Sequence, residues 1–170
     1  SMRPNYKVPV GISNKHIHLS AADLAALFGE GAELTFKKAL KQPGQFAAEE
    51  QITIEGPKGS TKLRVLGPVR KATQVELSAT DARSLGIKAP IRESGKLEGT
   101  PGVKITGPNG TIEIAEGVII AKRHVHLNPE QAKEAGAVNG EIVKVAFVEG
   151  DRKLIFDDVV VRTGPDHEGV

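Results

Sequence analysis

The sequence contains no cysteine among its 170 residues. Disulfide bonds and thiolate metal sites are therefore excluded, and any bound metal ion must be held by histidine or carboxylate side chains. Tryptophan is absent as well, and aromatic residues make up only 4% of the chain. We therefore do not expect the base-stacking surfaces of barrels that bind single-stranded nucleic acid.

Long apolar runs and a charge of one sign are also lacking. No run approaches the ~20 apolar residues that span a bilayer, and the N-terminal sequence has no signal-peptide core. The formal net charge is +2, with acidic and basic residues interspersed. We expect a cytoplasmic protein without nucleic-acid or membrane partners. Ser1 and Met2 resemble the remainder of a cleaved tag, so natural N-terminal residues are expected to be missing.

A repeated histidine pair is the most informative feature that is present. Four of the five histidines lie in two similar stretches, residues 14–20 and 122–128. Residues two apart on a β-strand point to one face, about 6.6 Å from each other. A single pair is most simply explained by hydrogen bonding, but two pairs in matching contexts favour a metal site. The candidate ligands are His16, His18, His124 and His126.

Each histidine pair leads into a short helix with recognisable ends. Ser20 or Asn128 stands at the N-cap, Pro129 opens the second helix, and a glycine follows each helix. A third copy of the unit leads from residues 74–78 into another capped helix and has no histidine. The expected helices cover residues 21–28, 79–85 and 129–135.

The third copy carries Glu76 where the other copies carry His18 and His126. A carboxylate can replace an imidazole as a zinc ligand, so Glu76 is a further candidate ligand. A fourth unit at similar spacing would place its ligand just beyond residue 170. We therefore expect the C-terminal part of the repeat to be truncated.

Tight turns separate the remaining apolar stretches. Hairpins are expected around residues 56–59, 107–110 and 149–152. Many short strands with only three short helices predict a mainly β fold, with two antiparallel β-barrel domains related by an internal repeat and capped by short α-helices. The expected strands cover residues 8–13, 33–40, 51–55, 60–66, 102–106, 111–114, 117–121, 141–148, 153–156 and 159–162.

The predicted division gives residues 1–90 the first three candidate ligands and residues 91–170 the second histidine pair. Arg70 lies in a turn six residues before Glu76. A guanidinium binds phosphate through two N–H groups, although a solvated side chain is the simpler interpretation of any single arginine. His167 has no strand pattern around it and is expected in a loop.

Several motifs in this chain are similar to those of one known family. They are Ile12–Ser20, Gln42–Ala47, Gly67–Lys71, Gln74–Glu76 and Arg123–His126. Together they resemble the propanediol-utilisation type of phosphate acyltransferases, the phosphate propanoyltransferases found with bacterial microcompartments. The resemblance covers about residues 8–162.

The resemblance implies two β-barrels, a dinuclear zinc site between them, and reversible transfer of a propionyl or similar acyl group between coenzyme A and phosphate. It also implies homo-oligomers and cargo in the microcompartment lumen. The first zinc, which meets the coenzyme A sulfur, would be held by His16, His18 and Glu76. The second would be held by His124 and His126, and the family's third histidine on that zinc lies beyond the end of this chain.

The resemblance also assigns the substrate contacts. Arg70 matches the family's phosphate-binding arginine. Contacts to coenzyme A are matched by Ser13, by Arg64 and by one lysine of the pair Lys37 and Lys38. With two metals and no cysteine, direct attack of phosphate on the thioester is favoured over an acyl-enzyme.

Two other functions stay open at this point. A zinc-dependent thioester hydrolase would use the same ligands to activate water and would need neither Arg70 nor coenzyme A binding. A nucleic-acid-binding or scaffold barrel would need no metal, and the low aromatic content and mixed charge disfavour it.

Histidine must be neutral to bind zinc, so activity is expected to fall as the pH drops below about 6.5. Initial rates of acyl transfer across pH 5 to 8 measure this dependence. A rate at pH 5 equal to that at pH 7.5 would contradict it.

Overall fold

The computed structural model describes residues 15–122, 124–149 and 152–163. By spatial contact, the described residues form two compact units. The larger contains residues 15–40 and 44–121, and the smaller contains residues 41–43 and those from 122 onward. The domain boundary predicted near residue 90 stays a prediction, because it separates copies of the sequence repeat and not the units defined by contact. By contact, residues 91–121 group with the larger unit.

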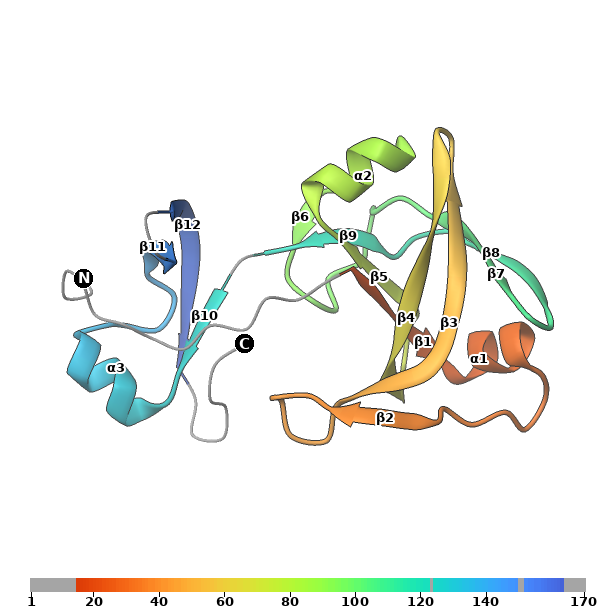
Figure 1. Cartoon of the computed structure of the whole chain (residues 1–170), viewed down its shortest axis with the longest axis horizontal. Helices are drawn as coiled ribbons and strands as arrows, with labels where there is room; N and C mark the ends of the chain where they lie inside the picture. Colours follow the sequence, from red (N-terminus) through yellow and green to blue (C-terminus); the bar gives the residue numbers. More distant parts are fainter. Residues whose placement is uncertain (1–14, 123, 150–151, 164–170) are drawn as a thin grey trace. The chain divides into compact units, whose positions relative to one another are not determined.

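The larger unit is built on one sheet of nine strands, curled like half of a barrel (Figure 1). The strand order is β6-β9-β5-β1-β4-β3-β7-β8, and β2 also pairs with β3. The strands are β1 His16–Ser20, β2 Phe36–Ala39, β3 Phe46–Gly56, β4 Gly59–Arg70, β5 Gln74–Leu77, β6 Ile91–Arg92, β7 Val103–Gly107, β8 Gly110–Ile114 and β9 Val118–Ala121. The helices are α1 Ala21–Phe28 and α2 Ala79–Leu85.

The core of the larger unit is formed by alternate residues of the central strands. On β1, Ile17 and Leu19 are fully buried, and Val75 of β5, also fully buried, pairs with Ile17. Leu27 of α1 and Leu85 of α2 pack into the same cluster. Because side chains alternate along a strand, the histidines of β1 point to the opposite face from Ile17 and Leu19.

The smaller unit contains a three-stranded sheet in the order β10-β12-β11 and one helix. Its buried cluster includes Val125, Leu127, Ala135 and Val161. The elements are β10 His124–Leu127, α3 Pro129–Ala135, β11 Ile142–Glu149 and β12 Arg152–Thr163.

The three helices begin and end where the sequence predicts. Each N-cap side chain accepts a hydrogen bond from the backbone N–H three residues on, which satisfies one of the unpaired donors of the first turn. Gly29, Gly86 and Gly136 follow the last helical residues. The donor and acceptor pairs are Asp23 N to Ser20 Oγ (3.2 Å), Asp81 N to Ser78 Oγ (3.0 Å) and Gln131 N to Asn128 Oδ1 (2.8 Å).

The three hairpins are confirmed, but one strand prediction is wrong. Two strands were expected over residues 153–156 and 159–162, and β12 is continuous from Arg152 to Thr163. Its register against β11 shifts so that Asp157 and Asp158 face a single residue. This β-bulge accommodates two poor strand formers without ending the strand. The strand predicted over residues 8–13 lies outside the described residues.

The prediction of wholly antiparallel sheets is also wrong. The mainly β composition is confirmed, but β1–β4, β5–β9, β6–β9 and β10–β12 are parallel pairs. The tight turns that the sequence reveals force antiparallel pairing only on the strands that they join. Between β1 and β4 lie α1, β2 and β3, and a connection of that length lets β4 return in the same direction.

The two Gly-Pro hairpin turns each dock on the end of a helix. Lys58 N donates to the carbonyl oxygen of Leu85 on α2 at 3.0 Å, and Asn109 N donates to that of Leu27 on α1 at 2.9 Å. The first glycine of each turn lies against the same helix end, where a Cβ on Gly107 would be 2.6 Å from the Leu27 oxygen. These turns therefore satisfy backbone carbonyls that the helix ends leave unpaired.

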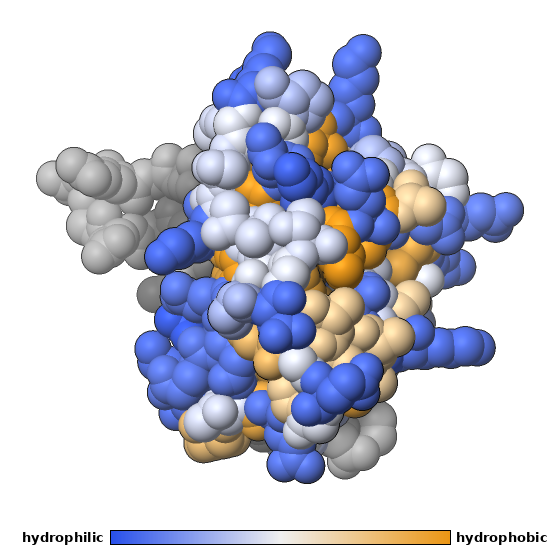
Figure 2. Space-filling model, turned by 90° about the vertical axis from the view of Figure 1, so that its right-hand side faces the viewer, coloured by the Kyte–Doolittle hydropathy of each residue, from blue (hydrophilic) through white to orange (hydrophobic). Residues whose placement is uncertain are grey.

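Among the described residues, no helix is long and apolar enough to cross a membrane. Figure 2 shows one face of the molecule, on which hydrophilic side chains project between smaller areas of apolar colour. This pattern agrees with the interspersed charges in the sequence.

Gly56 and Gly59 face each other across one turn and give a matched pair of variants. A Cβ on Gly56 would overlap the backbone carbonyl oxygen of Leu85, whereas a Cβ on Gly59 would lie 4.0 Å from its nearest neighbour. We expect Gly56→Ala to lower the free energy of unfolding by about 1–3 kcal/mol and Gly59→Ala to change it by less than about 0.5 kcal/mol. Urea denaturation measures both, and equal effects would contradict this account of the turn.

Candidate active site

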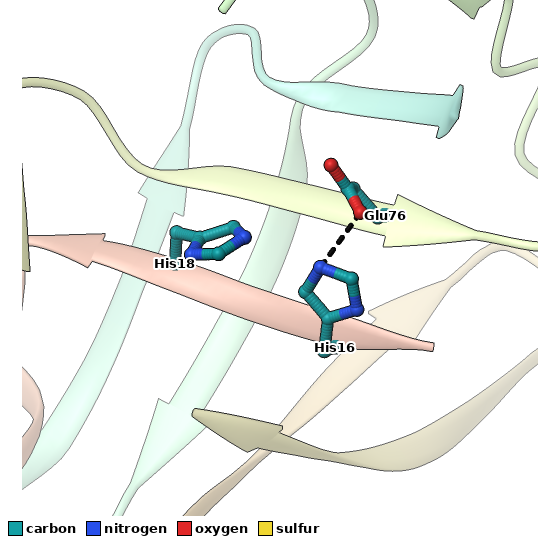
Figure 3. A group of neighbouring side chains, drawn as sticks. All are labelled: His16, His18 and Glu76. Carbon is teal, nitrogen blue, oxygen red and sulfur yellow. Dashed lines mark ion pairs between the residues drawn. The ribbon is translucent and has the colours of Figure 1, made fainter. Parts of the chain in front are cut away.

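Strands β1 and β5 bring three of the predicted metal ligands together (Figure 3). The strands pair antiparallel, with His16 opposite Glu76 and His18 opposite Gln74. His16, His18 and Glu76 each offer a ligand atom, and these atoms lie within 4.8 Å of one another. The three residues are thus placed side by side although Glu76 is far from the histidines in sequence.

The three side chains already contact one another. His16 Nε2 lies 2.6 Å from Glu76 Oε2. The imidazole rings of His16 and His18 meet edge to face, with their centroids 4.9 Å apart. The two histidines are only 6% and 3% exposed, so both imidazoles are removed from water.

His18 has an unusual environment for a buried polar group. Its Nδ1 atom is buried and has no hydrogen-bond partner within the described residues. Burial, followed by the charges of His16 and Arg70, lowers the His18 pKa from 6.5 to about 3, against an opposing contribution from Glu76. His18 therefore stays neutral at physiological pH, which is the form that binds a metal ion.

Arg70 and Glu76 contribute charges next to His16 and His18. Burial alone would raise the pKa of Glu76, but the hydrogen bond from His16 and the charges of His16, His18 and Arg70 together hold that pKa below its usual value. Burial lowers the pKa of Arg70, and Glu76 opposes that shift. The site thus combines a carboxylate with a partly buried cation.

Two residues without a predicted role connect Arg70 to Glu76. Arg70 Nη1 donates to Ser94 Oγ at 3.0 Å, and Gln74 Nε2 donates to the same oxygen at 2.9 Å. Gln74 Nε2 also donates to Glu76 Oε1 at 2.6 Å. Neither residue was predicted from the sequence. Gln74 could have been found, because it is two residues before Glu76 on one strand and so shares its face. Nothing in the sequence links Ser94 to the site.

The remaining predicted site residues belong to β4, β2 and β10 or lie outside the described residues. Arg64 on β4 pairs in register with His16, and its Nη1 donates to the Ala48 carbonyl oxygen at 2.8 Å. Lys37 and Lys38 are exposed on β2. The second histidine pair lies on β10 in the smaller unit. Ser13 and His167 lie outside the described residues.

The donor set fits a zinc ion. Two histidines and one glutamate are the protein ligands of one common class of catalytic zinc site, which keeps a further position open. The buried Nδ1 atom of His18 and the low pKa of that residue agree with such a role. The absence of cysteine fits a catalytic rather than a closed structural site.

Comparisons with known proteins agree with the motifs. The sequence pattern that defines the phosphate propanoyltransferases matches residues 9–169. The chain belongs to the phosphate propanoyltransferase family. Family membership confirms the resemblance stated from the motifs.

Curated relatives support this assignment along nearly the whole chain. A phosphate propanoyltransferase of Thermotoga maritima is 57% identical over 166 residues, which is 97% of this chain and 79% of the relative. Phosphate propanoyltransferases of Salmonella arizonae and Salmonella typhimurium are 52% and 51% identical, over 95% and 94% of this chain and 77% and 76% of their own lengths.

The low pKa of His18 makes stability depend on pH. In the unfolded chain His18 takes up a proton below about pH 6.5, whereas the folded metal-free protein resists this down to about pH 3. The unfolded state then binds more protons, so the free energy of unfolding falls as the pH drops. For His18 alone we expect a loss of about 2 kcal/mol between pH 6.5 and 5.

Urea denaturation of the metal-free protein at pH 7.5, 6.5, 5.5 and 5 measures this slope, and His18→Gln removes the titrating group. The variant should lose most of the slope over this range. Identical slopes in the two proteins would show that His18 is not responsible. Since His18 stays neutral at pH 5, its own protonation would not account for a loss of activity there.

Proposed function

We propose that this protein is a zinc-dependent phosphate acyltransferase that moves a propionyl or similar short acyl group reversibly between coenzyme A and inorganic phosphate. The observation that carries the proposal is the buried cluster of His16, His18 and Glu76 beside Arg70. Membership of the phosphate propanoyltransferase family supports the reaction and its two substrates.

His16, His18 and Glu76 would hold the first zinc ion. When bound, zinc supplies Lewis-acid stabilisation of the charge that develops on oxygen and sulfur during acyl transfer. The protein contributes a neutral His18, an ionised Glu76 and a buried setting, in which electrostatic interactions are stronger than in water.

Arg70 would bind the phosphate. One of its five N–H donors goes to Ser94, and within the described residues the others have no acceptor. Such a guanidinium can bind two oxygens of a phosphate at once. The charge of the neighbouring Glu76 raises the pKa of Arg70, against the lowering by burial, and so favours the charged guanidinium.

The reaction needs no protein nucleophile. An oxygen of phosphate attacks the thioester carbonyl carbon, the carbon–sulfur bond breaks, and acyl phosphate and the coenzyme A thiolate are formed. Holding phosphate beside the thioester supplies most of the advantage of a unimolecular reaction. Arg70 would fix the phosphate for this attack and offset its charge.

Strand register supports one part of the proposed coenzyme A site. His18 pairs with Leu66, Leu66 with Ala47, and Ala47 with Lys38. Paired residues of neighbouring strands share a face of the sheet, so Lys38 lies on the face of the histidines. Lys37 falls at a shift in the register between β2 and β3. We propose that Lys38 and Arg64 contact coenzyme A, with Ser13 and Lys37 as the further contacts that the family resemblance suggests.

We also propose a second zinc ion on His124 and His126, within two barrels related by duplication. Strand pairing supports the duplication, since β10 lies parallel to β12 as β1 lies parallel to β4. In both cases the second strand of the pair belongs to an antiparallel hairpin. Self-association and residence in a bacterial microcompartment are proposed on the family resemblance alone.

The test of this function is coenzyme A release from propionyl-coenzyme A with and without phosphate, with zinc content determined on the same sample. Release should require phosphate. Arg70→Ala should lower phosphate-dependent kcat/KM by about 100-fold or more, while Arg83→Ala, a change of an exposed arginine on α2, should leave it unchanged.

Zinc-containing protein that releases coenzyme A without phosphate, and does so equally in Arg70→Ala, would be a thioester hydrolase instead. Full phosphate-dependent activity after exhaustive removal of zinc would contradict the metal requirement.

A further inference from the structure

We propose that Gln74 is a positioning residue that couples the metal-binding carboxylate of Glu76 to the arginine that binds phosphate. This inference rests on the proposed function. Gln74 would touch neither substrate nor metal, and would act by fixing the side chains that do.

Gln74 completes a square of four side chains on one face of the sheet. The antiparallel register places His16 opposite Glu76 and His18 opposite Gln74. Three corners carry metal-ligating groups and the fourth carries an amide. In the sequence repeat, Gln74 stands where the other copies have the first histidine of a pair. This copy of the unit has therefore exchanged a ligand for a hydrogen-bonding group.

The orientation of the Gln74 amide is fixed by its neighbours. The backbone N–H of Gly95 donates to Gln74 Oε1 at 2.7 Å. Because a backbone N–H can only donate, the amide oxygen must face Gly95 and the amide nitrogen must face Glu76 and Ser94. The side chain is 1% exposed, so these hydrogen bonds are shielded from competition with water.

The Gln74 amide links the proposed metal ligands to Arg70, the proposed phosphate-binding residue. Gln74 Nε2 donates both to Glu76 Oε1 and to Ser94 Oγ, and Ser94 Oγ also accepts from Arg70 Nη1. Glu76 uses its other oxygen toward His16. A continuous chain of contacts therefore runs from His16 through Glu76, Gln74 and Ser94 to Arg70.

The same amide holds the loop that carries Ser94. Gly95 adopts a positive φ of 89°, and Lys96 N donates to the Glu93 carbonyl oxygen at 3.1 Å. This tight turn is tied to β5 through the Gly95 N–H. Loss of the Gln74 amide would release both the turn and one oxygen of the Glu76 carboxylate.

Two substitutions separate these roles. Gln74→Met keeps the length of the side chain but removes all three hydrogen bonds. Gln74→Glu keeps an acceptor for Gly95 but sets a second carboxylate against Glu76. Gln131→Glu is the matched control, since Gln131 caps α3 in the smaller unit and a carboxylate can accept the same hydrogen bond from Asn128 N.

Zinc affinity is measured on metal-free protein by competition with a chromogenic chelator, and KM for phosphate is measured with propionyl-coenzyme A at saturation. We expect Gln74→Met to weaken zinc binding by about 10–100-fold, as is typical when a partner of a metal ligand is lost. Both Gln74 variants should raise KM for phosphate by about tenfold or more, and Gln131→Glu should match the wild-type protein.

A double-mutant cycle tests whether Gln74 acts on phosphate through Ser94. If it does, Ser94→Ala combined with Gln74→Met should raise KM for phosphate no more than the larger single effect. Additive effects on KM would overturn this coupling.

Zinc affinity and KM for phosphate within about twofold of wild type in Gln74→Met would overturn the proposal, even with a lowered Tm, because Gln74 would then serve stability alone. Should that variant fail to fold, an unchanged KM in Gln74→Glu would overturn it equally. Phosphate-independent release by the wild-type protein would instead contradict the proposed function, and the zinc titration would still decide whether Gln74 positions Glu76.

Discussion

The pairing of β1 with β5 is the constraint on which the candidate site depends. Its register is set on the core side, where Ile17 and Val75 lie opposite each other and are fully buried. A slip by one residue would turn these side chains out and push the histidines into the apolar cluster. The hydrophobic effect on one face of the sheet therefore positions the candidate ligands on the other face, and the site needs no separate device to align its two strands.

Burying so many polar groups is costly unless they find partners. Most of them do, because the contacts from His16 to Arg70 form one connected network. The exception is the Nδ1 atom of His18, which has no hydrogen-bond partner in the part of the chain that the structure describes. An atom of this kind, on a histidine that stays neutral, is the strongest physical support for a metal ion at the first site.

Local features of this chain were predictable from sequence and long-range ones were not. The helix ends follow from caps within a few residues, such as Ser78 and Gly86. The frame shared by the three copies marked Glu76 as a candidate ligand, and the structure places it with His16 and His18. The contact between Arg70 and Ser94 joins residues 24 apart with no shared motif. Likewise, the bulge in β12 is defined by the register of that strand against β11, which no local motif reveals.

The docking of the hairpin turns explains why the compact units of the structure differ from the copies of the sequence repeat. The turn at Lys58 lies in the first hairpin and satisfies the end of α2, whereas the turn at Asn109 lies in the second and satisfies the end of α1. The turn at Asn109 thus closes a helix that lies before the first hairpin in the sequence. If the chain arose by duplication, as we propose, contacts of this kind join one copy to another, so the helix ends within residues 15–121 are not completed by neighbouring sequence alone.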